Sequence, residues 1–261
     1  MLRSLMTAAS GMKAQQLQVD TIANNIANSG TTGFKKNRLS FQSLFYQTYR
    51  EPGAPVGQGQ TDATGLQVGS GTDIAGSAMV MEQGEIQLTG GPLDMAIQGA
   101  GFFEVQLPSG ESRYTRDGSF RRNLNGDLVT PQGYFLIPNI SLPNGVSEIQ
   151  VGESGEVSYR DDTGQVVTGG TIQLARFANP MGLRAEGGNL YAETLSSGAA
   201  ARQNPGVAGT GVIRSGSLET SNVSTVDELV GLIVAQRNYE INSRAIQVSD
   251  EMLQVVYQLV R

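Results

Sequence analysis

The sequence predicts an α+β protein in which paired N- and C-terminal helices form a coiled-coil stem, with an all-β domain and an extended arm inserted between them. Three observations support this prediction. Apolar residues recur at heptad spacing at both ends of the chain, turn dipeptides recur through its middle, and a glycine-rich stretch precedes that middle. We expect the stem at 1–30 and 224–261, the connecting segment and arm at 31–75, and the β domain with its return linker at 76–223.

The C-terminal helix is predicted to begin at Thr225, because Ser224 and Asp227 have the spacing of a capping box. No proline and only one glycine follow, so the helix should run to the end of the chain, about 35 residues or roughly 50 Å. Its apolar residues form two lines. The first line is Val234, Asn238, Ile241, Ala245, Val248, Met252, Val255 and Leu259, and the second is Leu232, Tyr239, Ile246, Leu253 and Val260.

The N-terminal helix carries one such line and is expected to end at the glycine-rich segment 28–33. Pairing the two helices would bury one line from each, the first line in the case of the C-terminal helix, and leave the second exposed. A buried bundle in a monomer is the alternative, but no third long amphipathic helix is predicted. We therefore expect assembly with other copies. The expected interface is Leu5, Met12, Val19, Ile22, Ile26, Val234, Ile241, Ala245, Val248, Met252, Val255 and Leu259.

Between the helices, residues 49–71 are polar and rich in glycine and proline, which predicts an extended arm or long hairpin with little core of its own. From Gly76 to about Thr220 the pattern changes to short apolar strands separated by turns, as in an antiparallel sheet. The turn dipeptides are Ser109-Gly110, Asp117-Gly118, Asn125-Gly126, Gln132-Gly133, Asn144-Gly145, Ser154-Gly155 and Thr163-Gly164.

Composition excludes several classes of function. The chain has no cysteine and no histidine, which excludes disulfides, thiol nucleophiles, histidine triads and ordinary zinc sites. Its net charge of −6 is spread without runs, so we expect no nucleic-acid partner, and no apolar run is long enough for membrane insertion. Acidic residues such as Glu153 and Asp161 lie in turn-rich sequence and are interpreted as solvated. We therefore expect no catalytic residues, no cofactor and no metal.

Both ends of the chain resemble the bacterial flagellar rod and hook proteins. The N-terminal resemblance rests on Ala9-Ser10-Gly11-Met12, Ile22-Ala23-Asn24-Asn25-Ile26-Ala27-Asn28 and Thr32-Gly33-Phe34-Lys35. The C-terminal one rests on Glu219-Thr220-Ser221-Asn222-Val223, Gln236-Arg237-Asn238-Tyr239-Glu240 and Asp250-Glu251-Met252-Leu253-Gln254. Motifs in the middle, among them Tyr114-Thr115-Arg116-Asp117-Gly118, are most similar to the distal-rod branch of the family.

The resemblance implies a structural subunit of the distal rod, which assembles into a hollow helical tube and transmits motor torque across the periplasm to the hook. It implies contacts with the proximal rod, the hook, the surrounding ring proteins and the export apparatus, and export without a cleaved signal peptide. Two alternatives remain open. The chain could be a proximal-rod or hook-type subunit, or a periplasmic glycan-binding or glycan-cleaving β domain carried on a helical stalk.

Overall fold

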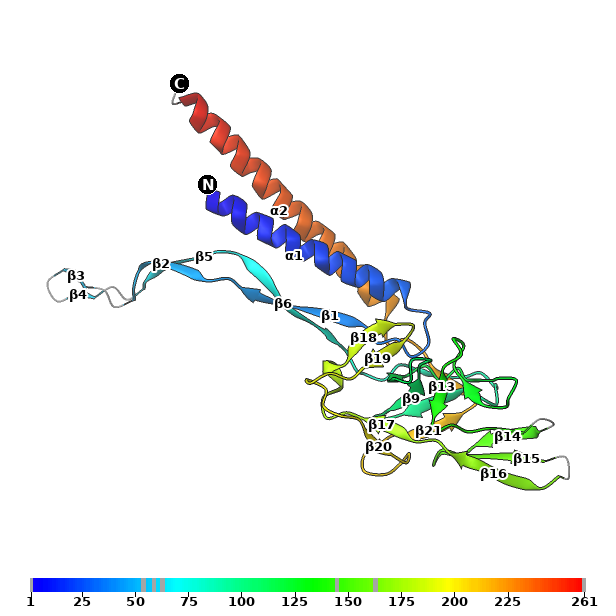
Figure 1. Ribbon diagram of the computed structural model, residues 1–261. Coiled ribbons are helices and arrows are strands. Elements are labelled where there is room, and N and C mark those ends of the chain that lie inside the picture. The colour runs from blue at the N-terminus through cyan, green and yellow to red at the C-terminus, as the bar shows by residue number, and fades with distance from the viewer. Residues whose placement is uncertain are drawn as a thin grey trace. The chain divides into compact units, whose positions relative to one another are not determined.

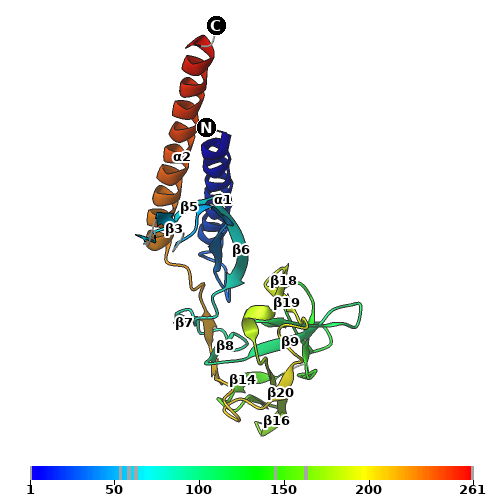
Figure 2. The ribbon, with the colours of Figure 1, turned by 90° about the vertical axis from the view of Figure 1, so that its left-hand side faces the viewer.

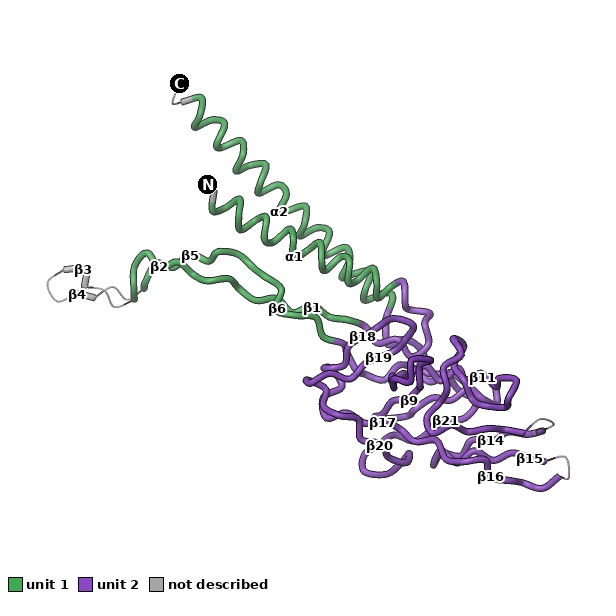
Figure 3. Tube along the Cα trace, in the orientation of Figure 1, with its two compact units in different colours: residues 1–26, 37–78, 225–261 green, residues 27–36, 79–224 purple. Residues whose placement is uncertain are grey.

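The fold is α+β, as predicted, with a helix at each end of the chain and a β-rich middle (Figure 1). The computed structural model describes residues 2–52, 55–57, 60–61, 64–143, 146–161 and 164–259. The chain divides into two compact units (Figure 3). Unit 1 consists of residues 1–26, 37–78 and 225–261, and unit 2 consists of residues 27–36 and 79–224.

Unit 1 contains the helices α1 (Leu2–Ala27) and α2 (Thr225–Leu259), which run antiparallel to each other (Figures 1 and 2). Helix α2 begins at the predicted residue and has the predicted length, 35 residues. Helix α1 ends one residue before the predicted stop segment at 28–33. Helix α2 therefore begins where the capping box indicates, and α1 ends where the glycine-rich segment indicates, because these signals act locally on the backbone.

Paired strands make up the rest of unit 1. Strand β1 (Asn37–Ser43) pairs with β6 (Thr72–Met79), and beyond this pair β2 (Tyr46–Arg50) pairs with β5 (Leu66–Gly69). The short strands β3 (Pro55–Gly57) and β4 (Gln60–Thr61) also pair. Every residue of β2 is exposed. A two-stranded ribbon with no buried face is marginal by itself, so contacts outside the ribbon must contribute to its stability.

Unit 2 is built on a nine-stranded sheet whose main path is β11-β12-β13-β9-β10-β19-β18. Strand β9 is the centre: β10 pairs along one edge, while β13 and β17 share the other. A three-stranded sheet, β14-β15-β16, and the pairs β21-β8 and β22-β7 complete the unit. The strands are β7 (Ile86–Leu88), β8 (Met95–Gln98), β9 (Phe102–Gln106), β10 (Ser112–Thr115), β11 (Arg121–Arg122), β12 (Leu128–Val129), β13 (Phe135–Ile137), β14 (Ser147–Val151), β15 (Glu156–Arg160), β16 (Val166–Thr171), β17 (Leu174–Arg176), β18 (Arg184–Gly187), β19 (Leu190–Ala192), β20 (Ala201–Gln203), β21 (Val212–Ser215) and β22 (Ser217–Glu219).

Two buried clusters form the core of unit 2, one on each side of β9. Alternate residues of a strand point to opposite faces, so Phe103 and Val105 join the larger cluster while Phe102 joins the smaller one. In the smaller cluster, the ring of Phe102 contacts Phe177 and Tyr191 edge-on, with centroids 5.8 and 5.9 Å apart. Such edge-on aromatic packing adds specificity to apolar burial. The central strand is therefore covered on both faces.

Candidate functional site

The two helices of unit 1 pair in a constant register. Three contacts define it. Asn25 Nδ2 donates to Glu228 Oε2 over 3.3 Å, a Cβ added to Gly231 would lie 3.4 Å from Ile22 Cδ1, and the hydroxyls of Ser4 and Ser249 lie 3.4 Å apart. Successive contacts are three and then eighteen residues apart on both helices, toward the start of α1 and toward the end of α2. One face of α2 therefore follows α1 through the whole of their overlap.

The face of α2 that packs on α1 differs from the predicted one. Leu232, Ile246 and Leu253 of the second line are half-buried and Tyr239 is 42% exposed, whereas the described side chains of the first line are all exposed. The prediction that the first line would face α1 was therefore wrong. The physical reason lies in the small side chains beside the second line, because Gly231, Ala235 and Ser249 let α1 approach closely.

The first line thus forms an exposed apolar face, which we call the outer stripe of α2: Val234, Ile241, Val248, Met252 and Val255. These five side chains are between 46% and 63% exposed. They recur at heptad spacing, so they lie along one side of the helix. Ala245, also predicted for the interface, is exposed as well, and the side chain of Leu259 lies outside the described residues.

The predicted interface residues of α1 lie elsewhere. Leu5, Met12, Val19 and Ile26 are half-buried, and Ile22 is 3% exposed and packs toward Gly231. Within one chain, the structure therefore does not bring these residues together with the outer stripe of α2. Their apolar surface contributes to unit 1 itself.

Helix α1 also holds the strands of unit 1. The guanidinium of Arg3 donates to Gln47 Oε1 over 2.7 Å, to the hydroxyl of Tyr49 over 2.9 Å and to the carbonyl of Val68 over 2.7 Å. It also lies over the Tyr49 ring, 5.7 Å from its centroid. Further along, Ser10 Oγ accepts from the backbone N–H of Thr72. These contacts provide part of the support that the exposed ribbon β2-β5 needs.

Unit 2 contains a buried charge cluster that joins the segment after α1 to the end of β22. Lys35 Nζ lies 2.5 Å from Glu219 Oε1, and both side chains are fully buried. Arg116 Nη1 donates to Glu219 Oε2 over 3.3 Å. The carboxylate also accepts from the backbone N–H of Gly84 over 3.0 Å, and Lys35 Nζ donates to the Glu82 carbonyl over 2.6 Å. One carboxylate therefore serves two cations, and burial lowers the pKa of Lys35 and of Arg116.

Backbone contacts reinforce this junction. The N–H of Gly33 donates to the carbonyl of Glu219 over 2.8 Å, and Asn222 Oδ1 accepts from the N–H of Lys36 over 2.8 Å. Gly33 has φ +67°, and a Cβ there would lie 2.6 Å from the carbonyl carbon of Arg116. Only glycine satisfies both conditions without strain. The junction thus joins three motifs that are far apart in the sequence.

Sequence patterns alone assign no role to Lys35, Arg116 or Glu219. Each lies in a turn-rich segment, where no periodicity in the sequence marks it. The available signal was their presence in the motifs that carry the family resemblance. No cluster of metal-ligating side chains occurs among the described residues, and none of the described helices is long and apolar enough to cross a membrane.

A pair of terminal helices that leaves an apolar stripe exposed, in a chain whose middle forms a separate β unit, is typical of a structural subunit of a larger assembly. Comparisons with known proteins agree. Residues 5–35 match the family model described as flagella basal body rod protein. Residues 96–159 match the flagellar hook protein FlgE/F/G D1 domain, and residues 214–259 match the flagellar basal body rod FlgEFG protein C-terminal model.

Similar proteins extend this match over the whole chain. The flagellar basal-body rod protein FlgG of Borreliella burgdorferi is 49% identical, with both chains covered completely. Its namesake in Caulobacter vibrioides is 46% identical over 99% of each chain, and that of Bacillus subtilis is 41% identical over all of both chains. The chain therefore belongs to the flagellar hook and basal-body rod protein family.

Proposed function

We propose that this chain is the structural subunit of the flagellar distal rod, which self-assembles into a hollow helical tube and transmits motor torque across the periplasm to the hook. The observation that carries the proposal is the outer stripe of α2, an apolar face that no part of its own unit covers among the described residues. The relatives that match the full length of the chain bear the name of a basal-body rod protein, which supports the same assignment.

The energetics of the outer stripe support assembly. Each of its five side chains leaves about half of its surface in water. Burying the remainder would contribute roughly 1 kcal/mol per side chain. The contribution is small for one residue, but it recurs at every subunit of a polymer, and a helical array supplies a neighbour along the full length of the helix.

Each part of the chain has its own role in the rod. Residues 1–30 and 224–261 form a coiled-coil stem that lines the channel. Residues 31–75 form a connecting segment and an extended arm that lies against neighbouring subunits. Residues 76–223 form an inserted antiparallel β domain, with its return linker, that faces outward.

In the rod, the subunit has several partners, and its location is the periplasm. The subunit contacts further copies of itself, the proximal rod, the hook and the surrounding ring proteins. It reaches the periplasmic rod through the flagellar export apparatus, without a cleaved signal peptide. Its activity is mechanical, so it requires no catalytic group.

Electron microscopy of the purified full-length chain at high concentration tests this function. We expect straight hollow tubes of uniform diameter. A chain that stays monomeric at all concentrations would contradict the proposal and favour the alternative class, a glycan-binding or glycan-cleaving β domain. Binding to isolated peptidoglycan, measured by co-sedimentation in parallel, would separate that alternative directly.

A further inference from the structure

An apolar groove runs along one side of the helix pair of unit 1. Val19 of α1 and Tyr239 of α2 line a hollow of about 440 Å³ there, and its remaining lining residues are Gln16, Gln236 and Glu240. Val19 belongs to the half-buried apolar line of α1, and Tyr239 belongs to the second line of α2. Both lines repeat every seven residues, so they stay on this side as the helices run past each other. We call this surface the groove: Leu5, Met12, Val19 and Ile26 of α1 with Leu232, Tyr239, Ile246 and Leu253 of α2.

The constant register of the two helices makes the groove continuous. A Cβ added to Gly11 would lie 2.9 Å from Asn242 Nδ2, in the same register as the three contacts that define the pair. In this register Val19 lies between Leu232 and Tyr239 along the length of the pair. The arrangement recurs at each step of seven residues, so equivalent positions of the groove follow one another about every 10.5 Å.

The outer stripe of α2 lies on the opposite side of the pair. At about 100° per residue, Ile241 and Tyr239 lie about 160° apart around α2. The buried residues Ala235 and Ser249, which face α1, lie between them. One side of the helix pair is therefore an apolar groove, and the other side carries an apolar ridge. Two complementary surfaces on different sides of one molecule form a head-to-tail contact, which continues from copy to copy rather than ending at a dimer.

The stripe and the groove match in spacing and in length. Four stripe residues, Val234, Ile241, Val248 and Val255, are seven residues apart, as are the four groove residues of α1. Each set spans three heptads, about 32 Å at 1.5 Å per residue. Apolar side chains of one helix that recur every seven residues can therefore enter successive positions of the groove along its whole length.

The charges beside the two surfaces are complementary. Arg237 lies four residues before Ile241 and Arg244 lies three residues after it, so both adjoin it on the helix surface, and both are exposed. Glu240 lines the hollow of the groove, and among the described residues no basic side chain lines it. A stripe seated in the groove of a second copy would bring guanidinium groups toward this carboxylate, which favours their encounter.

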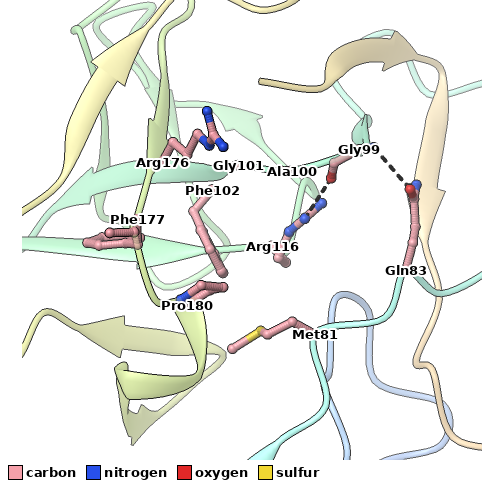
Figure 4. A pocket seen from close by; sticks show the side chains of 11 residues that line it. Met81, Gln83, Gly99, Ala100, Gly101, Phe102, Arg116, Arg176, Phe177 and Pro180 are labelled. Carbon is pink, nitrogen blue, oxygen red and sulfur yellow. Dashed lines mark hydrogen bonds between the residues drawn. The ribbon is translucent and has the colours of Figure 1, made fainter. Parts of the chain in front are cut away.

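The hollow of unit 2 has no such counterpart. It measures about 420 Å³ and lies beside Arg116 (Figure 4). Arg116 Nη2 donates to the Gly99 carbonyl over 2.7 Å, and the N–H of Gly99 donates to Gln83 Oε1 over 3.0 Å. Arg176 Nη1 donates to the carbonyl of Ala208 over 2.6 Å. These polar groups are used within unit 2, so the groove of the helix pair is the better docking surface.

We propose that the outer stripe of α2 from one copy docks into the groove of the next copy. The inference rests on the proposed function and deepens it, because it names the two faces that meet in the polymer. A second copy is the occupant because the chain itself carries a ridge with the spacing, length and flanking charge that the groove fits. Each copy gives its stripe to one neighbour and its groove to another, so assembly covers every stripe except those at one end.

Disulfide cross-linking tests which faces meet, and the absence of cysteine from the chain makes the test specific. Ile241→Cys is combined with Gln16→Cys, which places a thiol at the hollow of the groove. The control combines Ile241→Cys with Leu17→Cys. Leu17 is exposed at the same height along α1 but about 100° further around the helix. Assembled protein is sedimented, oxidised and separated on a non-reducing gel.

We expect the variant with Gln16→Cys to give a ladder of covalent dimers, trimers and longer chains, because a head-to-tail contact links each copy to two others. The control and Ile241→Cys alone should run as single chains. Tubes without a ladder, or an equally strong ladder from the control, would overturn the inference and leave the proposed function intact. Covalent dimers from Ile241→Cys alone would overturn it as well, since stripe would then meet stripe. A parent chain that forms no tubes would overturn the proposed function itself.

A charge substitution tests the same contact without cysteines. Gln16→Lys should raise the critical concentration for tube formation, measured by sedimentation of the full-length chain, by about tenfold or more. The docked stripe would bury the ammonium group beside Arg237 and Arg244 of the next copy. Leu17→Lys is the matched control and should leave the critical concentration unchanged. The same critical concentration for the parent and Gln16→Lys, or an equal rise in both variants, would contradict docking in the groove.

Discussion

Lys35 and Glu219 form a fully buried ion pair with 2.5 Å between Nζ and Oε1, although 184 residues separate them in the sequence. Lys35 lies in the segment that follows α1, and Glu219 ends β22 shortly before α2 begins. The pair therefore joins the segment that follows α1 to the segment that precedes α2. Arg116 extends it to a cluster in which the carboxylate is the shared member.

Because Glu219 is shared by two cations, replacing it should lower the free energy of unfolding more than replacing Lys35 does. Glu219→Gln leaves two buried cations without their anion, whereas Lys35→Met leaves the contact between Glu219 and Arg116 in place. We expect Glu219→Gln to lower the free energy of unfolding of unit 2 by about 3–5 kcal/mol and Lys35→Met to lower it by less. Urea unfolding followed by circular dichroism measures both.

Arg160→Met is the control for loss of an ion pair, because the contact between Arg160 and Glu148 is exposed. It should change the free energy of unfolding by less than about 1 kcal/mol. If Lys35→Met cost as much as Glu219→Gln, the carboxylate would not be the shared member of the cluster.

The surroundings of Gly33 predict that alanine destabilises the protein much more at this position than at the nearby Gly30. Gly33→Ala would require a left-handed backbone at an alanine and would place its Cβ 2.6 Å from the carbonyl carbon of Arg116. We expect a loss of about 2 kcal/mol or more. Gly30→Ala is the matched control, since a Cβ there has no atom of the described residues within 4 Å. Thermal unfolding of both variants provides the measurement, and equal melting temperatures would refute the strain argument.

Tyr191 predicts a loss of stability in alkaline solution. Burial raises its pKa to about 12 from the ordinary value of 10.0. Between these two values the unfolded chain releases the phenolic proton while the folded chain retains it, so the free energy of unfolding should fall as the pH rises from about 10 to about 12. Its contribution is roughly 2–3 kcal/mol across that window.

The comparison for this prediction is Tyr191→Phe, which has no proton to lose at this position. Urea unfolding of both proteins at several pH values between 9 and 12 isolates the contribution of Tyr191. Parent and variant should diverge as the pH rises, with the parent losing more stability. Parallel curves would show that Tyr191 titrates alike in the folded and unfolded chain.

Local signals in the sequence predicted much of the fold. The start of α2 at Thr225 followed from capping chemistry, and the turn glycines at 110, 126, 133, 155 and 164 all have positive φ, as hairpin turns require. Gly118 belonged to the same series of dipeptides but has no positive φ; a Cβ there would overlap the Met95 carbonyl, so close packing determines this glycine.

Interactions between distant segments could not be predicted in the same way. Periodicity identified two apolar lines on α2 but not which of them faces α1, because that choice depends on Gly231 and Ser249 meeting Ile22 and Ser4 across the helix pair. The partners of Lys35 could not be predicted either, because a lysine that becomes buried is not marked by any periodicity in the sequence. Such contacts depend on how distant segments pack together in three dimensions, so the local sequence around each residue does not reveal them.

The central claim is that the outer stripe of α2 drives assembly. Val248→Asp places a carboxylate in the middle of this stripe, and Gln247→Asp places the same charge on the exposed residue beside it. Burying an unpaired carboxylate costs several kcal/mol, so only the first variant should fail to assemble. Circular dichroism of both variants checks that the β-rich unit remains folded.

The most direct measurement is electron microscopy of the parent and these two variants at equal high concentration. Straight tubes are predicted for the parent and for Gln247→Asp, and no tubes for Val248→Asp. Tubes of normal length and number from Val248→Asp would contradict the claim that the outer stripe is the contact that holds the polymer together.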